Sequence, residues 1–345
     1  MSTLPAALGD VLEFLRAHAP PDVYEPRDLE RVVAAADVEF FLAGSTIFGR
    51  DAQPLEQLRV VRTGAVEMVL DERVLEQLGP GDCFGHAAML SRLPAGVAAR
   101  AHEDTLCYRL PAQPVQARAH SGPGAPTHRT AARAYKRTRL PRGRTPWREA
   151  RYCAVDLELS GLDPKRHEIV SYGAVPIEDG RVQLGAAVHG RVRPRGAISE
   201  AAAQVHGIRA ADLADAPPLE DAIDPLLGAL AGRVPVAHVA AIERGFLRPA
   251  LRRLGVRLRR PMIDTSVLGL VWLYERDGSA PRHTSLSALA DTLGLPAHRP
   301  HDALGDALTT AQAFVALAAH LDARRAETVR SLISAERRLD WLRRR

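Results

Sequence analysis

The chain has 345 residues, of which 46% are hydrophobic and 25% charged, and its formal net charge is +5. This length exceeds one typical domain and supports two hydrophobic cores. The three cysteines, Cys83, Cys107 and Cys153, stand far apart without paired Cys/His spacing, which argues against a disulfide framework or a structural zinc site. No stretch reaches the roughly 18 apolar residues of a membrane span, and the amino terminus lacks a signal-peptide pattern. We therefore expect a cytoplasmic protein of two domains, without membrane contact.

The chain up to residue 111 predicts short helices followed by a small β-roll. Apolar residues recur at helical spacing within residues 7–37, with a Pro-Pro break between two helical stretches. From Phe40 onward, short β-rich segments alternate with glycine turns such as Gly79-Pro-Gly81. We expect residues 1–111 to form a separate β-roll domain.

The segment Phe84-Gly85-His86, after the glycine-rich turn, resembles a cyclic-nucleotide-binding domain. In that family an Arg pairs with the cyclic phosphate, and a Glu after Phe-Gly holds the ribose hydroxyl. His86 stands at the Glu position, as in a divergent branch of the family; a surface histidine that caps a helix is the alternative interpretation. The resemblance implies a regulatory or scaffolding module that contacts a small nucleotide through Phe84, Gly85 and His86. Arg92 or Arg100 could replace the missing Arg.

Residues 111–150 carry nine Arg or Lys residues and one acid, Glu149, among several prolines and glycines. This composition predicts a flexible basic linker, which we place at residues 112–148. Its charge suits nucleic-acid phosphates, and a solvated linker that binds nothing explains the composition equally well.

Residues 149–320 alternate between predicted strands and helices, which indicates an α/β fold with a mixed sheet covered by helices. Apolar residues at helical spacing and a final run of three arginines predict a basic C-terminal helix over residues 321–345. The expected strands are 151–157, 168–177, 182–192 and 234–238. The expected helices are 210–213, 219–230, 240–254, 285–293 and 303–319.

Two carboxylates, Asp156 and Glu158, lie one residue apart on the first of these strands. Side chains at i and i+2 face the same side of a strand, so both can meet one ligand while Val155 and Leu157 face the protein interior. A divalent cation with oxygen ligands would relieve the repulsion between them. Taken alone, the same pair is typical of a solvated strand face, so the later motifs decide between the two interpretations.

Later stretches add further acids and histidines. Glu243 follows the predicted strand at 234–238, and Asp306 lies near the start of the predicted helix at 303–319. His301 and Asp306 are five residues apart, which is about 140° of rotation on a helix. We therefore place His301 on the loop before the helix and Asp306 on the first turns of the helix.

Asp156-x-Glu158, the stretch 238–247 and His301 with Asp306, in this order, resemble the three motifs of the DEDDh 3′–5′ exonucleases. This superfamily includes proofreading epsilon subunits and ribonuclease T. Supporting segments follow in the family's order: Leu159-Ser160-Gly161, Val205-His-Gly-Ile208, Asp264-Thr265 and Ser285-Leu-Ser-Ala-Leu-Ala290.

The resemblance implies an α/β ribonuclease H-like domain over residues 149–320 that hydrolyses single-stranded DNA or RNA from the 3′ end to nucleoside 5′-monophosphates. It implies that His301 is the general base that takes a proton from the attacking water. Two divalent cations, Mg²⁺ or Mn²⁺, would be held by Asp156, Glu158, Glu243 and Asp306. The substrate contacts it implies are Leu159, Ser160, His238 and Phe246.

Glu243 occupies the position of the family's second-motif Asp. Its extra methylene displaces the carboxylate, and Mg²⁺ tolerates distorted geometry poorly, which predicts higher activity with Mn²⁺. The alternative is that Glu243 is a surface acid paired with Arg244 or Arg248. The protein would then be a catalytically weakened nucleic-acid-binding or ligand-sensing module. The sequence leaves open the oligomeric state and the choice between DNA, RNA and short oligonucleotides.

Overall fold

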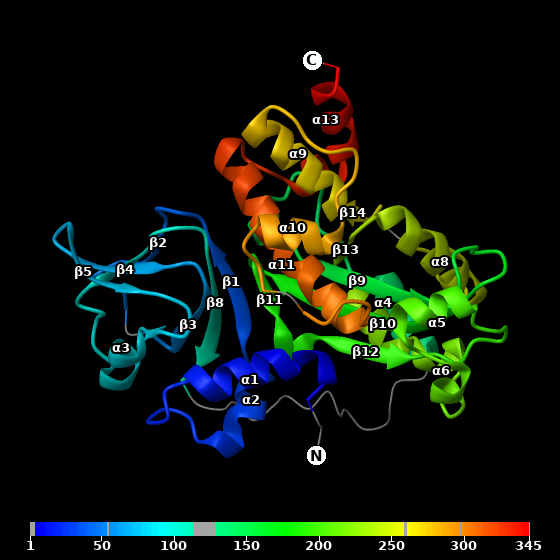
Figure 1. Ribbon diagram of the computed structural model, residues 1–345, viewed down its shortest axis with the longest axis horizontal. Helices are drawn as coiled ribbons and strands as arrows, with labels where there is room; N and C mark the ends of the chain where they lie inside the picture. Colours follow the sequence, from blue (N-terminus) through cyan, green and yellow to red (C-terminus); the bar gives the residue numbers. More distant parts are fainter. Residues whose placement is uncertain (1–3, 54, 113–127, 259–260, 297, 345) are drawn as a thin grey trace. The chain divides into compact units, whose positions relative to one another are not determined.

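The computed structural model describes residues 4–53, 55–112, 128–258, 261–296 and 298–344 (Figure 1). Contacts between residues divide the chain into two compact units. The first unit contains the described residues up to 112 together with Arg181–Gly185 and Ala290–Pro296, and the second contains the rest. Every helix among the described residues is too short or too polar to cross a lipid bilayer.

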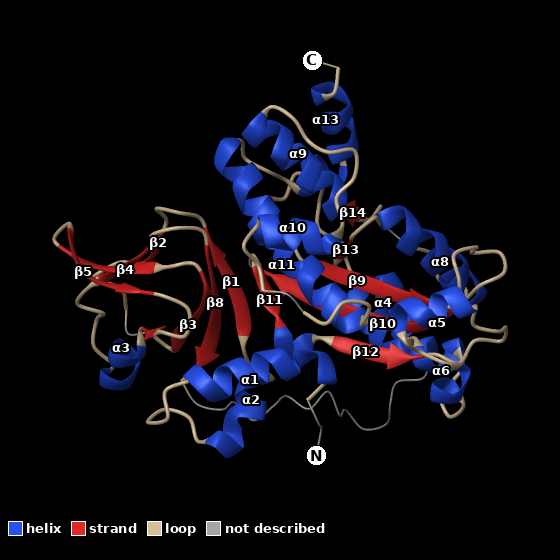
Figure 2. Ribbon diagram, viewed as in Figure 1, coloured by secondary structure: helices blue, strands red, loops and turns tan. Residues whose placement is uncertain are grey.

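The first unit is a β-roll preceded by short helices, as expected (Figure 2). Strands β1, β8, β3 and β6 are neighbours in one sheet, and β2, β7, β4 and β5 form the other. Its helices are α1 (Gly9–His18), α2 (Leu29–Val33) and α3 (His86–Ser91). Its strands are β1 (Asp37–Phe41), β2 (Thr46–Phe48), β3 (Gln57–Thr63), β4 (Val66–Leu70), β5 (Arg73–Leu78), β6 (Cys83–Phe84), β7 (Ala98–Ala101), β8 (Thr105–Pro111) and the short β11 (Arg181–Gln183), which pairs with β1.

The second unit is built on a mixed sheet in the order β14-β13-β9-β10-β12, which confirms the predicted α/β architecture. β13 runs parallel to β9 and β14, and β10 runs antiparallel to β9 and β12. The strands are β9 (Tyr152–Leu159), β10 (Ile169–Glu178), β12 (Val188–Arg191), β13 (Val234–Ala237) and β14 (Ile263–Asp264). The helices are α4 (His128–Arg137), α5 (Glu200–His206), α6 (Leu219–Ala222), α7 (Asp224–Leu230), α8 (Ala240–Arg253), α9 (Thr265–Asp277), α10 (Leu286–Thr292), which begins in this unit, α11 (Ala303–Arg324), α12 (Val329–Ile333) and α13 (Ala335–Leu342).

Alternation along β9 separates the hydrophobic core from the candidate site. Val155 and Leu157 belong to a buried apolar cluster with side chains of α7 and α8, as the sequence predicts. On the other face of the strand, Tyr152 packs against Phe314 of α11, with ring centroids 4.7 Å apart. Asp156 shares the face of Tyr152 because side chains alternate with a period of two, so the carboxylates of β9 point to the side covered by α11.

A helix occupies part of the expected flexible linker, so that prediction is wrong for residues 128–137. Residues 113–127 lie outside the described residues. Ala131, Ala132 and Tyr135 are buried in the core cluster that includes side chains of α7. The basic composition of the segment conceals this apolar stripe, which is the face on which α4 packs.

Two further elements differ from the sequence expectations. The strand expected over 182–192 is interrupted, because a 3-10 turn at Leu184–Ala186 separates β11 from β12. The single basic helix expected over 321–345 is the end of α11 followed by two short helices, α12 and α13. Thr328 caps α12, because its hydroxyl accepts the backbone N–H of Ser331. Because the cap at Thr328 begins a new helix, these residues do not form the one continuous helix that their apolar spacing predicts.

Gly173 allows α11 to lie directly on the sheet. It stands opposite Asp156 in the ladder between β9 and β10. A Cβ at residue 173 would lie 2.1 Å from the carbonyl oxygen of Ala303, the first residue of α11. The missing side chain therefore lets the first turn of α11, which carries Asp306, approach Asp156.

We predict that Gly173→Ala destabilises the protein by about 1–3 kcal/mol, the usual cost of overpacking, and weakens Mn²⁺ binding by displacing the first turn of α11. Thermal unfolding and Mn²⁺ titration measure the two effects. Gly228→Ala is the matched control, because Gly228 is exposed on α7 and an added Cβ meets nothing within 4 Å. An unfolding midpoint for Gly173→Ala equal to that of the wild type would contradict the prediction.

Candidate metal centre

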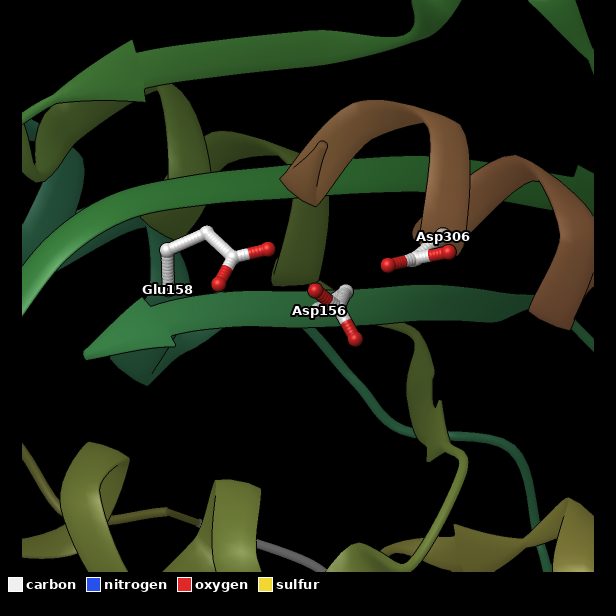
Figure 3. A group of neighbouring side chains, drawn as sticks. All are labelled: Asp156, Glu158 and Asp306. Carbon is white, nitrogen blue, oxygen red and sulfur yellow. The ribbon is translucent and has the colours of Figure 1, made fainter. Parts of the chain in front are cut away.

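Asp156, Glu158 and Asp306 bring their carboxylates together between the sheet and α11. Each side chain offers one oxygen, and these three oxygens lie within 4.8 Å of one another. Figure 3 shows the two side chains of β9 and the one from α11 turned toward a common space. A compact group of carboxylate oxygens is the ligand set that Mg²⁺ and Mn²⁺ prefer.

Glu243 is the fourth acid of the expected set, and it lies on the first turn of α8. Its side chain is buried, with 5% of the residue surface exposed, and its Oε2 finds no hydrogen-bond partner among the described residues. Burial and, second, repulsion from Glu158 raise its pKa to about 8. The alternative of a surface acid paired with Arg244 or Arg248 therefore fails, because a buried carboxylate is not a surface acid. An unpartnered buried oxygen fits a missing cation.

Burial and mutual repulsion raise the pKa of the other three carboxyls as well. For Asp156 the causes are burial and then the charges of Glu243, Asp306 and Glu158. Burial, followed by repulsion from Asp306, raises the pKa of Glu158 to about 7. The pKa of Asp306 is raised by burial, against the opposing effect of a hydrogen bond from the His301 backbone. A bound cation would favour the ionised form of every one of these groups.

His301 lies on a turn before α11, as predicted, and Asp306 lies on the first turn of that helix. The backbone of His301 has a φ of 58°, and its N–H donates to Asp306 Oδ2 at 2.8 Å. The His301 residue is exposed. The loop is therefore tied to a candidate metal ligand while the imidazole stays accessible to water.

Asp264 fixes the start of α8, and hence the position of Glu243. Its carboxylate accepts the backbone N–H of Val239 at 3.1 Å and of Ala240 at 2.9 Å. It also accepts the N–H of Ser266 at 2.9 Å. Val239 has a φ of 56°, which is rare for a β-branched residue and needs such external support. In the sequence, Asp264 belongs to one of the supporting family segments. An Asp immediately before a helix is an N-cap signal, and that signal points to this role.

His206 is a second residue that the sequence reasoning did not assign to the site. Its Nε2 donates to the carbonyl oxygen of Leu159 at 3.1 Å, because its Nδ1 accepts the N–H of Ile208 at 3.0 Å. Burial is the main cause of its lowered pKa, and the charge of His301 adds to it. His206 therefore supports the end of β9 in a neutral form. A histidine just before the helix-ending Gly207 was the available signal.

Three of the four predicted substrate contacts are buried. Leu159 and Phe246 are buried in the core cluster. Ser160 is also buried, and its hydroxyl accepts the N–H of Glu168 at 2.9 Å. The backbone of Leu159 and Ser160 directly follows Glu158 and therefore lies next to the carboxylate group, whereas the Leu159 side chain packs in the core with Val155 and Leu157.

His238 is half-buried, and its ring contacts two other segments of the chain. Its Nδ1 lies 3.0 Å from the Thr265 hydroxyl, and its Nε2 lies 3.1 Å from the carbonyl oxygen of Thr284. Both ring nitrogens are engaged, which argues against the predicted contact with a substrate. The sequence alone does not distinguish a histidine at a strand end that contacts a ligand from one that forms hydrogen bonds to two other segments of the chain.

The residues expected to contact a nucleotide in the first unit lie around the start of α3. Phe84 is buried, and Gly85 has a φ of 84° immediately before the helix, which begins at His86. Arg100, one candidate for the missing Arg, donates two hydrogen bonds to Glu67, at 3.1 and 2.7 Å. Its guanidinium is therefore already engaged with a carboxylate.

Two family models match the chain. Residues 153–314 match the RNase T-type family described as exonuclease, and residues 38–120 match the cyclic nucleotide-binding domain. Both matches agree with the resemblances drawn from the sequence motifs.

Several bacterial proteins are similar to the second part of the chain. A DNA polymerase III subunit epsilon-like protein of Rhodobacter capsulatus is 34% identical over 197 residues, covering 56% of this chain and 27% of that protein. A PolC-type DNA polymerase III of Thermotoga petrophila is 35% identical over 167 residues, covering 48% of this chain and 12% of that protein. This chain thus spans only a fraction of the length of these relatives.

A solved structure of exonuclease X in complex with 5′ overhanging duplex DNA is also similar. It aligns with a TM-score of 0.42 and 24% identity, covering 53% of this chain and 98% of that chain. A cyclic nucleotide-binding-like protein from Brucella abortus aligns with a TM-score of 0.27 and 20% identity, covering 30% of this chain and 91% of that chain.

We predict that the metal-free protein loses stability as the pH rises. A carboxyl whose pKa is raised by folding contributes stability below its ordinary pKa, and this contribution is lost as the pH rises through about 7 for Glu158 and about 8 for Glu243. Thermal unfolding in EDTA should show the midpoint falling across this range, and Mn²⁺ should restore it. Glu243→Gln should flatten the pH dependence. A profile that neither Mn²⁺ nor this substitution changes would refute the prediction.

Proposed function

We propose that this chain, which carries an exonuclease domain at residues 153–314 and a cyclic nucleotide-binding domain before it, is a metal-dependent 3′–5′ exonuclease of single-stranded DNA or RNA. One observation carries the proposal. Asp156, Glu158 and Asp306 have oxygens within 4.8 Å of one another, and the exposed His301, on the turn before α11, donates its backbone N–H to Asp306. Such a group suits two-metal hydrolysis of a phosphodiester.

The carboxylates would provide the binding site for the cations. Asp156, Glu158, Glu243 and Asp306 would hold two divalent cations, Mg²⁺ or Mn²⁺, and the unpartnered Oε2 of Glu243 supports its inclusion. When bound, the cations supply an acidified water and neutralise charge on the phosphodiester. The rigid placement of the ligands on β9, α8 and α11 would keep the scissile phosphate aligned with that water.

His301 would act as the general base. An imidazole can both accept and donate a proton, and the exposed position of His301 leaves its ring open to a water at the edge of the carboxylate group. His301 would take a proton from the water, whose oxygen forms a bond to phosphorus. The bond between phosphorus and the 3′-oxygen of the preceding nucleotide breaks, that oxygen takes up a proton from solvent, and a nucleoside 5′-monophosphate leaves. Leu159 and Ser160 would lie against the sugar of the terminal nucleotide.

The first unit would regulate or position this activity, with a small nucleotide as the proposed ligand at Phe84, Gly85 and His86. The domain bounds stay as proposed from the sequence, at residues 1–111 for the first domain and 149–320 for the exonuclease. The cytoplasm is the proposed location.

We predict that the protein with Mn²⁺ shortens a 5′-labelled single strand stepwise from its 3′ end, and that Asp156→Asn lowers the rate by about 100-fold or more, because one charge of the ligand set is lost. Gel electrophoresis of the labelled products measures both. Glu149→Gln is the matched control, because Glu149 is exposed and outside the site. A labelled mononucleotide as the first product would indicate the opposite polarity, and no cleavage with any strand or metal would favour the catalytically weakened binding or sensing module.

We predict faster cleavage with Mn²⁺ than with Mg²⁺, because Glu243 carries one methylene more than an Asp and Mn²⁺ accepts the displaced carboxylate more readily. Rates at saturating concentrations of each cation measure the difference. Glu243→Gln should slow cleavage with both cations by at least about 10-fold. Equal rates with Mg²⁺ and Mn²⁺ in the wild type would show that Glu243 does not distort the site.

A further inference from the structure

We propose that the outer face of α8 binds the sugar-phosphate backbone of the nucleic-acid strand whose end enters the carboxylate site. The face consists of Arg244, Arg248 and Arg252, here named the α8 arginine stripe. The proposal rests on the exonuclease function proposed above and adds a second contact region to it.

The spacing of the stripe follows from helix geometry. Residues four apart on a helix advance about 40° around the axis, so the three arginines lie within an arc of about 80°. Eight residues separate Arg244 from Arg252, which is about 12 Å along the axis. A strand laid along this length can place one phosphate at each of the three arginines.

The guanidinium groups of the stripe have no anionic partner among the described residues. None of the three forms an ion pair or a side-chain hydrogen bond there, whereas the next residue, Arg253, pairs with Glu168 at 2.8 Å. Like charges four residues apart on a helix repel each other, so the three arginines of the stripe destabilise α8 unless an anion compensates their charge. Three aligned cations that lack a protein partner are suited to a polyanion.

A shallow hollow follows the stripe. It is lined by Ala241, Arg244, Gly245, Arg248, Pro249 and Arg252, without any acidic residue. Ala241 and Gly245 are small, which leaves space between the arginine stems. Arginine presents a planar fork of donors that matches phosphate oxygens, so a phosphate seated in the hollow could accept from two stripe residues.

The same helix connects the stripe to the candidate metal centre. Glu243 is adjacent to Arg244 in sequence but points inward, because it is buried while Arg248 and Arg252 are exposed. The amino-terminal end of α8 also carries the positive end of the helix dipole. A strand that runs along the stripe toward this end would therefore reach the carboxylates with its last nucleotide.

The test is equilibrium binding of a 5′-fluorescein-labelled 20-nucleotide oligo(dT) in EDTA, measured by fluorescence anisotropy at several salt concentrations. For a single strand, the slope of log affinity against log salt is about −0.7 for each neutralised phosphate. The triple variant Arg244→Gln, Arg248→Gln and Arg252→Gln should therefore reduce the steepness by about 2. Between 50 and 200 mM salt, the wild type should lose about 20-fold more affinity than the variant.

Two control variants separate charge position from total charge and from folding. Gln at Arg16, Arg73 and Arg337, three exposed arginines outside α8, removes the same net charge and should leave the slope unchanged. Lys at the three stripe positions keeps the charge and should retain the slope. A slope in the triple Gln variant equal to that of the wild type, or an equal decrease in the outside control, would overturn the proposal. Displacement of oligo(dT) by polyglutamate at equal charge concentration would also overturn it, because the stripe would then suit an acidic protein as well.

The binding assay contains no divalent cation, so it does not depend on hydrolysis. Stepwise cleavage of the same oligonucleotide by the wild type with Mn²⁺ tests the exonuclease function separately. If the wild type cleaves the oligonucleotide and the triple Gln variant has the wild-type salt slope, the exonuclease function is supported and the stripe proposal is refuted. Altered slopes without cleavage would support the stripe as a nucleic-acid contact and refute the exonuclease function.

Discussion

Four buried or half-buried carboxyl groups repel one another, and this electrostatic constraint governs the second unit. Asp156, Glu158, Glu243 and Asp306 all have raised pKa values, because burial and mutual repulsion disfavour their ionised forms. Such a cluster is stable at neutral pH when protons or divalent cations compensate the charge. The strand β9 and the helices α8 and α11 hold these four groups in place.

Three features of the fold maintain that geometry. Gly173 leaves no side chain between β10 and the start of α11, so Asp306 approaches Asp156. Asp264 accepts two backbone N–H groups at the start of α8, which fixes the turn that carries Glu243. His206 supports the carbonyl of Leu159 at the end of β9. None of these residues is a candidate metal ligand, and each holds one of the three elements that supply the ligands.

The sequence allows the main elements and the acids of the candidate site to be predicted, and the features that it misses share one cause. Local patterns identified β9, α8 and α11 because apolar periodicity and the acidic residues occur within short segments. They do not reveal α4, where basic residues conceal an apolar stripe, or the contacts of the His238 ring with Thr265 and Thr284. In these cases the deciding partner is distant in sequence, so no local pattern records it.

The sequence by itself determined the types of residue and their order: two acids on one face of a strand, a glutamate after the next strand, and a histidine five residues before the last acid. These follow from backbone periodicity, which is a local property. Only the tertiary structure decided that Glu243 is buried and lacks a partner rather than paired on the surface, because burial depends on the packing of α8 against the sheet. It likewise decided that Arg244, Arg248 and Arg252 form no ion pair within the part of the chain that the structure describes, since ion pairs such as that of Arg253 with Glu168 join residues far apart in the chain.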